Sequence, residues 1–369
     1  PRRLEQTPGA SRWAIPIDAL TIAVLAGYAK YATIAPPWEW DFWSIWGLKG
    51  RLFWAAHSID WKFLLDREHD FAHLDYPLLL PLTFDVTAVV GGGWNDRWLG
   101  FLYVAFACST LLVIRGLTEE EHGPIAGAVT TLAVTGCCCS GWVGLGEGPM
   151  LAYSSCALLL IRRSLRLNDR ISPLGAVLLS FAALTKNEGL SLLIATLIGV
   201  TLSSKTRIRE SALLVPIAIT TALLLVRRLL HLQASDFHLA GLRNTMADLP
   251  GFLRTMTSVN PPHPILWIMF GSALVIGGAA FFERERLLIT TIVLHLLACI
   301  AAYSLSALEL GWHVRNSWPR VSSQIEPLIG FVVASFLLRY FPGQRSGPSG
   351  ESESSIDVVF RGTCVAPDS

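Results

Sequence analysis

The chain has 369 residues, of which 52% are hydrophobic and 15% are charged, and its mean hydropathy is +0.48. An ordinary soluble domain carries roughly 25% charged residues, so this composition excludes a typical water-soluble fold and predicts a polytopic integral membrane protein. The net charge is +1, and Lys and Arg stand in short clusters between apolar stretches. Because no continuous basic face results, no nucleic-acid partner is expected.

Apolar stretches of about 17 to 22 residues recur along the chain, and each is long enough to cross the ~30 Å hydrocarbon layer as a helix. They predict an all-α transmembrane bundle of about ten spans. The expected spans are 14–35, 97–116, 124–143, 149–165, 171–185, 188–204, 211–230, 264–282, 287–308 and 325–341. The first stretch is too long for a cleaved signal and lacks a small-residue cleavage site, so a signal anchor is expected. Residues 1–341 would form one transmembrane domain, followed by a disordered cytoplasmic tail at 342–369.

Basic residues between the spans predict the orientation of the bundle. With an even number of crossings, all the basic clusters fall on one side: Arg2, Arg3 and Arg12, Arg162 to Arg170, Lys205 to Arg209, Arg284 to Arg286, and the tail after Arg339. Both termini are therefore expected in the cytoplasm. The acidic run 118–122 would also be cytoplasmic, but acidic residues weigh little in this rule.

The stretch 76–92 is apolar but contains Pro77, Pro81 and Asp85. Counting it as a span would invert every basic loop that follows. We therefore expect a re-entrant or surface helix there.

The first outer loop, 36–75, begins with a dense run of aromatic residues, which is typical of the headgroup layer. Phe42, Trp46, Lys49 and Phe53 recur at nearly helical spacing, so a helix lying flat on the membrane is expected. Glu39 and Asp41 stand just after the first span. They are either solvated carboxylates beside an aromatic anchor, or acids at the membrane surface where the low dielectric lets one act as a general base.

Two further acidic features fall on the outer face. His69, Asp70, His73 and Asp75 lie within seven residues of one another, which suits either a metal site or a wet loop, although no recognised ligand pattern is present. Glu147 stands between glycines in GLGEGPM. Its turn either aims a carboxylate into a cavity or simply carries an acid.

Cationic residues occur near the same face. Lys186 and Glu188, in ALTKNEGL, lie beside apolar segments and either face a cavity or pair with each other. Arg315 and Arg320 precede the last span, where an arginine either holds a phosphate through its two-pronged guanidinium or extends to lipid headgroups. The seven cysteines lie mostly in apolar runs and predict neither a disulfide framework nor a CxxC metal site.

Five segments in order, WDFWSIWGLKGR, HLDYPLLLPL, the acidic turn, LTKNEG and RVSSQIEP, resemble the bacterial GT-C glycosyltransferases. More narrowly, they resemble the polytopic enzymes related to protein mannosyltransferases and to the lipid A aminoarabinose transferase. The likeness extends from residue 14 to about residue 341. It implies a hexosyl- or pentosyltransferase that moves a sugar from a polyprenyl-phosphate carrier to a lipid, glycan or protein acceptor on the periplasmic face. Family members often have further spans or a periplasmic domain, and neither is expected here.

The resemblance also implies roles for single residues. Asp41 matches the acid of the family's first outer loop, which deprotonates the acceptor hydroxyl or binds a metal near it, and Glu39 is its weaker companion. Glu147 falls where the family usually has Asp, so its role stays open. Asp41 and Glu147 are the candidate ligands for a divalent metal, Mg²⁺ or Mn²⁺. Lys186 and Arg320 fall where cations contact the carrier phosphate. The remaining expected substrate contacts are Lys49, His73, Asp75 and Glu188.

The expected chemistry follows from the two reacting groups. A leaving phosphate needs fixed cations, and the acceptor needs a base on the opposite side of the anomeric carbon, so a direct displacement with inversion is expected. A transporter or flippase for a lipid-linked glycan would also need charges facing a cavity, but the sequence shows no internal repeat of the kind that transporters have. A non-catalytic membrane subunit is a third alternative, in which the acidic loop residues would be dispensable.

Overall fold

The computed structural model describes residues 10–139, 143–203, 210–232 and 239–340. The regular elements in these ranges are all helices, so the described part of the chain has an all-α architecture. The helices are α1 (Ala10–Ile34), α2 (Gly47–Ala56), α3 (Trp61–Leu65), α4 (Leu79–Val90), α5 (Asp96–His122), α6 (Pro124–Cys138), α7 (Glu147–Arg166), α8 (Pro173–Thr185), α9 (Glu188–Ser203), α10 (Leu214–Leu229), α11 (Leu239–Ala247), α12 (Leu249–Thr257), α13 (Pro264–Ser304), α14 (Leu310–Ser323) and α15 (Glu326–Tyr340). The predicted tail at 342–369, Arg2, Arg3 and the basic loop at 205–209 lie outside the described residues.

Several helices are long and apolar enough to cross a membrane, as expected for a membrane protein. Among the described residues these are Arg12–Ile34, Asp96–His122, Ser211–Leu229 and Pro264–Ser304, and the bent pair α14 and α15 would be a fifth if it formed one span. Four further apolar helices, α4, α6, α8 and α9, are shorter. A helix lies within each of the predicted ranges, but the count of ten spans is not confirmed.

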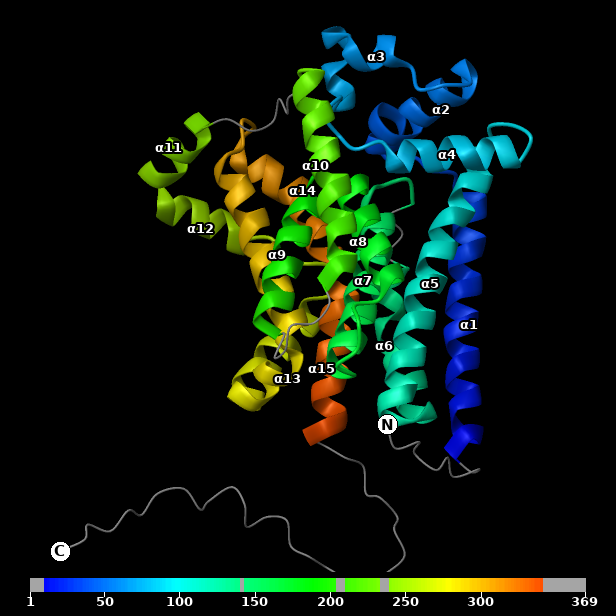
Figure 1. The fold of residues 1–369 in the computed structure, drawn as a ribbon, viewed down its shortest axis with the longest axis vertical. Coiled ribbons are helices and arrows are strands. Elements are labelled where there is room, and N and C mark those ends of the chain that lie inside the picture. The colour runs from blue at the N-terminus through cyan, green and yellow to red at the C-terminus, as the bar shows by residue number, and fades with distance from the viewer. Residues whose placement is uncertain (1–9, 140–142, 204–209, 233–238, 341–369) are drawn as a thin grey trace, which may run out of the picture.

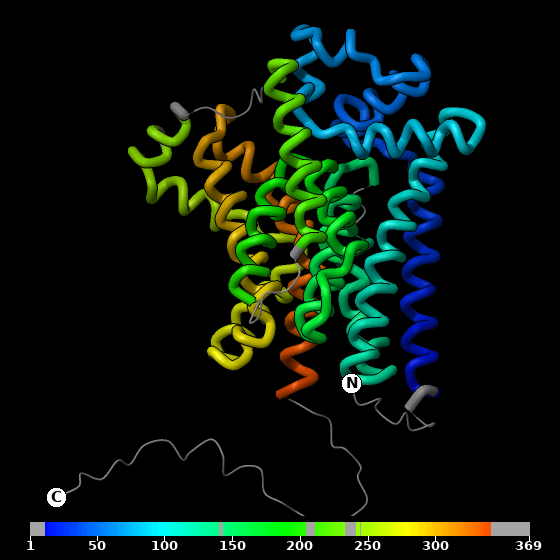
Figure 2. Tube along the Cα trace, viewed as in Figure 1, coloured from blue at the N-terminus to red at the C-terminus, as the bar shows by residue number. Residues whose placement is uncertain are grey.

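The long helices pack side by side into one bundle with two ends (Figure 1). α1 runs from the end near the N-terminus to the end that carries α2, α3 and α4, which we call the α2–α4 end. There α4 lies crosswise to α1 and α5. The tube in Figure 2 shows that α15 ends at the same end of the bundle where α1 begins.

α13 combines two predicted spans, 264–282 and 287–308, in one helix that is broken at Gly278 and Glu285. Gly278 has φ +55° and ψ −155°, a backbone conformation that residues other than glycine rarely adopt. The chain reverses near this break, at the end opposite α2–α4 (Figure 2). The first half of α13 therefore runs away from the α2–α4 end, and the second half runs back toward it without a separate loop between them.

A buried ionic network closes the end opposite α2–α4. The Arg162 guanidinium donates hydrogen bonds to Glu285, with Nε 2.6 Å from Oε2, and to Glu121, with Nη1 2.6 Å from Oε1. Arg163 pairs with Glu120 at 2.8 Å, and Arg166 pairs with Glu121. The acidic run 118–122 is thus the last turn of α5, where its carboxylates neutralise the arginines of α7.

The first outer loop contains the expected helix, which begins as a π-helical turn over Phe42–Trp46 and continues into α2. Phe42, Trp46, Lys49 and Phe53 do share a face, but all four are fully buried against the protein. That face packs on α4 and its neighbours, so it is not available to lie on the membrane. The exposed aromatic residues of this loop are instead Trp38, Trp40, Trp43, Trp61 and Phe71.

Candidate functional site

A chain of ion pairs links four segments that are far apart in the sequence. Arg320 pairs with Asp41, and its Nη2 lies 3.1 Å from Glu147 Oε1. Lys186 Nζ lies 2.8 Å from the same Glu147 oxygen and 2.9 Å from Glu188 Oε1. Five of the predicted site residues therefore form one contiguous ionic cluster.

Each member of the cluster sits at a helix end or in a break between helices. Asp41 immediately precedes the π-helical turn, Glu147 is the first residue of α7, and Arg320 is in the last turn of α14. Lys186 and Glu188 flank the break between α8 and α9. Helix ends leave backbone groups and side chains free to point inward, so these four segments bring their polar groups to one place.

Glycines let the segments approach closely around Glu147. A Cβ on Gly146 would lie 2.9 Å from the Lys186 side chain and 3.1 Å from Trp46. Gly144 has φ +96°, where a side chain would be strained. The glycines of GLGEG therefore allow the Lys186 ammonium to reach Glu147.

The cluster is deeply buried and carries more acid than base. The Lys186 side chain is 5% exposed and that of Glu147 is 2% exposed. Three carboxylates, Asp41, Glu147 and Glu188, face two cations. Glu147 Oε2 and Glu188 Oε2 are buried and have no hydrogen-bond partner. Buried acceptors of this kind are costly unless a ligand or water satisfies them.

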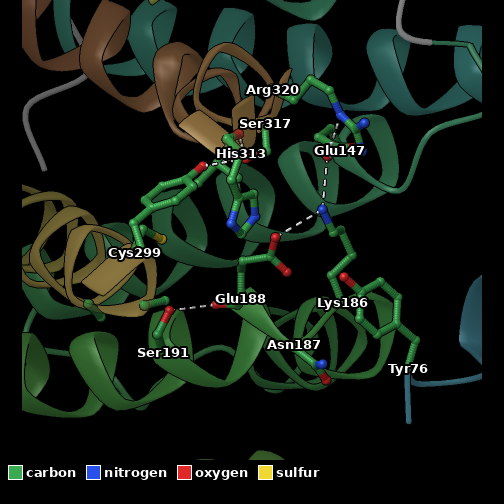
Figure 3. Close-up of a pocket in the computed structure, with 14 residues that line it drawn as sticks. Tyr76, Glu147, Lys186, Asn187, Glu188, Ser191, Cys299, His313, Ser317 and Arg320 are labelled. Atoms are coloured by element: carbon green, nitrogen blue, oxygen red, sulfur yellow. Dashed lines mark hydrogen bonds and ion pairs between the residues drawn. The ribbon is translucent and has the colours of Figure 1, made fainter. Parts of the chain in front are cut away.

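A cavity of about 230 Å³ adjoins the cluster (Figure 3). Glu147, Lys186, Glu188 and Arg320 line one side of it. The rest of its wall comes from Tyr76, Asn187, Ser191, Ala298, Cys299, Ala302, Tyr303, His313, Ser317 and Val321. The wall therefore combines ionic groups with hydroxyl, imidazole and apolar groups, and the His313 ring lies beside Glu188 (Figure 3).

Lys49, His73 and Asp75 do not line this cavity and belong to a second polar network beside it. Lys49 Nζ donates a hydrogen bond of 2.6 Å to the His73 carbonyl. Asp75 Oδ2 accepts hydrogen bonds from Asn187, at 2.8 Å, and from Arg227, at 3.0 Å. Asn187 lies between Lys186 and Glu188, so this network holds the α8–α9 break in place from the other side.

Two side chains of the first outer loop, Glu39 and Lys49, have shifted pKa values. Burial raises the pKa of Glu39, and the neighbouring Asp41 and Glu147 add to that rise while Arg320 opposes it. Burial also lowers the pKa of Lys49 to about 7, against the attraction of Asp75. Glu39 thus lies in the field of the cluster, as its place beside Asp41 suggests.

The remaining predicted polar residues lie away from the cavity. Arg315 is largely exposed, with its guanidinium 4.0 Å from Glu309, so of the two candidate phosphate arginines only Arg320 lines the cavity. His69 lies 3.8 Å from Asp66, and Asp70 lies 3.9 Å from Arg67. These contacts within the 3₁₀ turn leave the four residues at 69–75 dispersed instead of convergent.

Asp41 and Glu147 do not frame an open metal position. One nitrogen of Arg320 contacts a carboxylate oxygen of each, so the guanidinium stands where a shared divalent ion would have to lie. The single group of three candidate ligands found in the described residues lies elsewhere and includes neither acid.

Sequence reasoning did not single out Asn187, Arg227 or His313. Asn187 belongs to the LTKNEG segment, so the motif itself could have pointed to it. Arg227 stands at the end of a span and resembles an ordinary interfacial arginine.

No protein-family model matches the chain, and neither does any curated protein or solved structure.

Proposed function

We propose that this protein is a membrane glycosyltransferase of the GT-C type, which moves a sugar from a polyprenyl-phosphate carrier to an acceptor by inverting displacement. The carrying observation is the buried cluster Asp41–Arg320–Glu147–Lys186–Glu188 beside a cavity in an apolar helix bundle. Charges inside such a bundle are expensive, and they mark substrate sites or ion pathways far more often than they serve stability.

The polar groups of the cavity suit a phosphosugar. Arg320 and Lys186 supply cationic donors for a phosphate, and charge-assisted contacts of this kind are the strong ones. The unpartnered Oε2 atoms of Glu147 and Glu188 would accept hydrogen bonds from sugar hydroxyls. A hydroxyl-rich ligand therefore satisfies the groups that the protein leaves unsatisfied.

In the proposed topology of ten crossings, the cavity lies at the outer face and interrupts two short helices. α8 has 13 residues and α9 has 16, so each spans only about 20 to 24 Å of a ~30 Å layer. Irregular backbone at membrane depth is tolerated where it lines a cavity, and the α8–α9 break does so. In this topology the α2–α4 end is periplasmic and both termini are in the cytoplasm of a bacterial cell.

In the mechanism, the carrier phosphate binds Arg320 and Lys186 and competes with Asp41 for the guanidinium. The freed Asp41 carboxylate then takes the proton of the acceptor hydroxyl as that oxygen attacks the anomeric carbon. The bond from that carbon to the phosphate oxygen breaks on the opposite side, and polyprenyl phosphate leaves with its charge held by the two cations. Glu147 and Glu188 orient the sugar, and Glu39 supports Asp41.

The test is reconstitution with a panel of polyprenyl-phosphate sugars, following release of free polyprenyl phosphate. We expect release by the wild type. Asp41→Asn should lower the rate by about 10² to 10⁴, the range of a lost general base, and Arg320→Met by about 10² to 10³, as for a lost charge-stabilising donor. Asp70→Asn, an exposed acid of the same loop, should retain full activity. Full activity of Asp41→Asn would remove the mechanism.

The same assay separates the alternative, a transporter or flippase for a lipid-linked glycan. Such a protein would move the intact lipid between leaflets and release no polyprenyl phosphate from any donor. The Arg162 network at the opposite end favours the transferase, because an alternating pathway would have to open those buried ion pairs.

A further inference from the structure

Three helix ends bring a thiol, an imidazole and a carboxylate together outside the cluster described above. Cys137 is in the last turn of α6, His263 precedes the first residue of α13, and Glu326 is the first residue of α15. Their candidate ligand atoms all lie within 4.8 Å of one another. Neither the transfer chemistry nor the two polar networks uses these residues.

The imidazole lies between the other two groups. His263 Nδ1 is 2.7 Å from Glu326 Oε2. Cys137 Sγ lies within 4.8 Å of the imidazole, and a Cβ on the adjacent Gly136 would lie 3.6 Å from Nε2, so this nitrogen faces α6. Nucleophile, base and orienting carboxylate in this order make up the arrangement that activates a cysteine.

Glu326 is itself held firmly in its orienting position. It is fully buried, and its Oε1 accepts hydrogen bonds from the His263 backbone N–H at 3.1 Å and from the Trp267 indole at 3.0 Å. A carboxylate fixed by two donors fixes the ring in turn.

The geometry favours this role over a metal site. An imidazole coordinates one metal ion through one nitrogen, while the other nitrogen usually donates to a carboxylate or carbonyl. With Nδ1 held by Glu326, an ion at Nε2 would find only Cys137 as a second ligand from the group. Stable zinc sites normally need three or four protein ligands.

The pair Cys137 and His263 opens into an apolar groove of about 370 Å³ between α6, α13 and α15. Its other lining residues include Val129, Leu266, Met269, Val333 and Leu338. Along α15 the lining runs from Gly330 to Leu338, about 12 Å. Val129, Met269 and Leu337 along it are exposed, so the groove faces the lipid.

We propose that Cys137 is a nucleophile that accepts a fatty acyl group from a phospholipid ester as a thioester, with the acyl chain in the groove. The site lies at helix ends of the α2–α4 side, where the hydrocarbon gives way to headgroups and where ester carbonyls lie. His263 takes the thiol proton as Sγ bonds to the carbonyl carbon. The ester C–O bond breaks, and the proton passes to the departing alcohol oxygen of the lysophospholipid.

The experiment uses the full chain in nanodiscs of phosphatidylglycerol whose acyl chains end in an alkyne, with alkyne-tagged palmitoyl-CoA as a second donor in a separate arm. Thioester label is detected by azide coupling, by its loss in neutral hydroxylamine, and by mass spectrometry of the peptide. Cys138→Ala and Cys139→Ala are matched controls at the two positions that follow Cys137. Thermal unfolding and polyprenyl-phosphate release are measured for every variant.

We expect hydroxylamine-sensitive label on the wild type and both controls, with lysophospholipid released in equal amount. Cys137→Ala should lose the label, and His263→Gln should slow labelling by about 10² or more, while both variants release polyprenyl phosphate normally. Cys137→Ser replaces the alanine variant if that variant fails to fold. Label from palmitoyl-CoA with none from the phospholipid would refute a phospholipid ester as the donor.

Three further results would overturn the proposal. The first is no label on Cys137 from either donor. The second is label at an unchanged rate in His263→Gln, which would show an accessible thiol and no activated nucleophile. The third is stoichiometric Zn²⁺ binding that disappears in Cys137→Ala and blocks labelling, which would make the group a metal site.

Discussion

Lys186→Met should strongly destabilise the protein, because Lys186 is the shared partner of two carboxylates in a buried place. Its Nζ lies 2.8 Å from Glu147 and 2.9 Å from Glu188. The variant leaves three acids of the cluster facing Arg320 alone. Breaking a buried ion pair by removing one partner costs about 3 to 5 kcal/mol. In this variant Glu188 would lose its ion-pair contact with Lys186, and Glu147 would keep only Arg320.

The control is an ion pair of the same length at the surface. Arg163 lies 2.8 Å from Glu120, but these side chains are 47% and 46% exposed. Arg163→Met should cost below about 1 kcal/mol, as exposed pairs do. Equilibrium unfolding in mixed micelles, followed by circular dichroism, gives both free energies under one condition.

Adding Glu147→Gln to Lys186→Met should recover at least half of the loss, because it removes one of the uncompensated charges. This rescue separates electrostatics from packing, since a loss caused by altered packing would persist. Equal small losses for Lys186→Met and Arg163→Met, or no recovery in the double variant, would refute the view that burial sets the energy of this cluster.

Three further changes test other parts of the structure. Burial lowers the pKa of Lys49 from 10.5 to about 7. Between these pH values the unfolded chain holds a proton on Lys49 that the folded chain has released, so the stability of the wild type should rise with pH relative to that of Lys49→Met. A constant difference in thermal unfolding between the two proteins across this pH range would contradict the prediction. Gly100→Ala should cost about 1 to 3 kcal/mol, because the new methyl would collide with the Ala32 carbonyl of α1; Gly116→Ala on the same helix meets nothing within 4 Å and should be neutral or stabilising in the same unfolding assay. Arg162→Met should lower the free energy of unfolding by about 3 to 5 kcal/mol, while folded protein keeps its rate of polyprenyl-phosphate release, because Arg162 lies at the opposite end; a lost rate in folded protein would argue against that separation.

Length and hydropathy located the helices well, because an apolar stretch in a membrane must satisfy its backbone hydrogen bonds internally and therefore forms a helix. They could not establish how many helices cross the membrane. α8 and α9 meet at the predicted break after residue 185, but they have only 13 and 16 residues, and α13 carries two predicted spans in one kinked helix. Such breaks depend on tertiary contacts that hydropathy does not encode. The helix 42–56 was foreseen, but the direction of its apolar face was not, since protein and lipid attract the same residues.

The motifs located much of the ionic cluster, because a charge within an apolar segment needs a partner. Asp41, Glu147, Lys186, Glu188 and Arg320 were each unusual in their local sequence, and the structure brings them together. Lys49, His73 and Asp75 looked similar but form another network, since spacing along a loop does not specify which way a side chain points.

The cysteine of the proposed acylation site was missed for a different reason. Cys137 stands in an apolar run, where a thiol is ordinarily a small hydrophobe, and its two partners are distant in sequence. His263 and Glu326 each flank a span and are individually unremarkable. Only the meeting of three helix ends gives them a shared chemistry, so no local pattern could have identified the group.

The sharing of Arg320 between Asp41 and Glu147 has a consequence for the proposed transfer. Arg320 contacts both carboxylates, so the Asp41 side chain is occupied by the guanidinium while no donor is bound. A carrier phosphate that draws Arg320 toward itself would release the Asp41 carboxylate, which could then accept a hydrogen bond from the acceptor hydroxyl. Donor binding and positioning of the acceptor would then be one electrostatic event. The acceptor hydroxyl would meet a free carboxylate only when a sugar is present to be transferred.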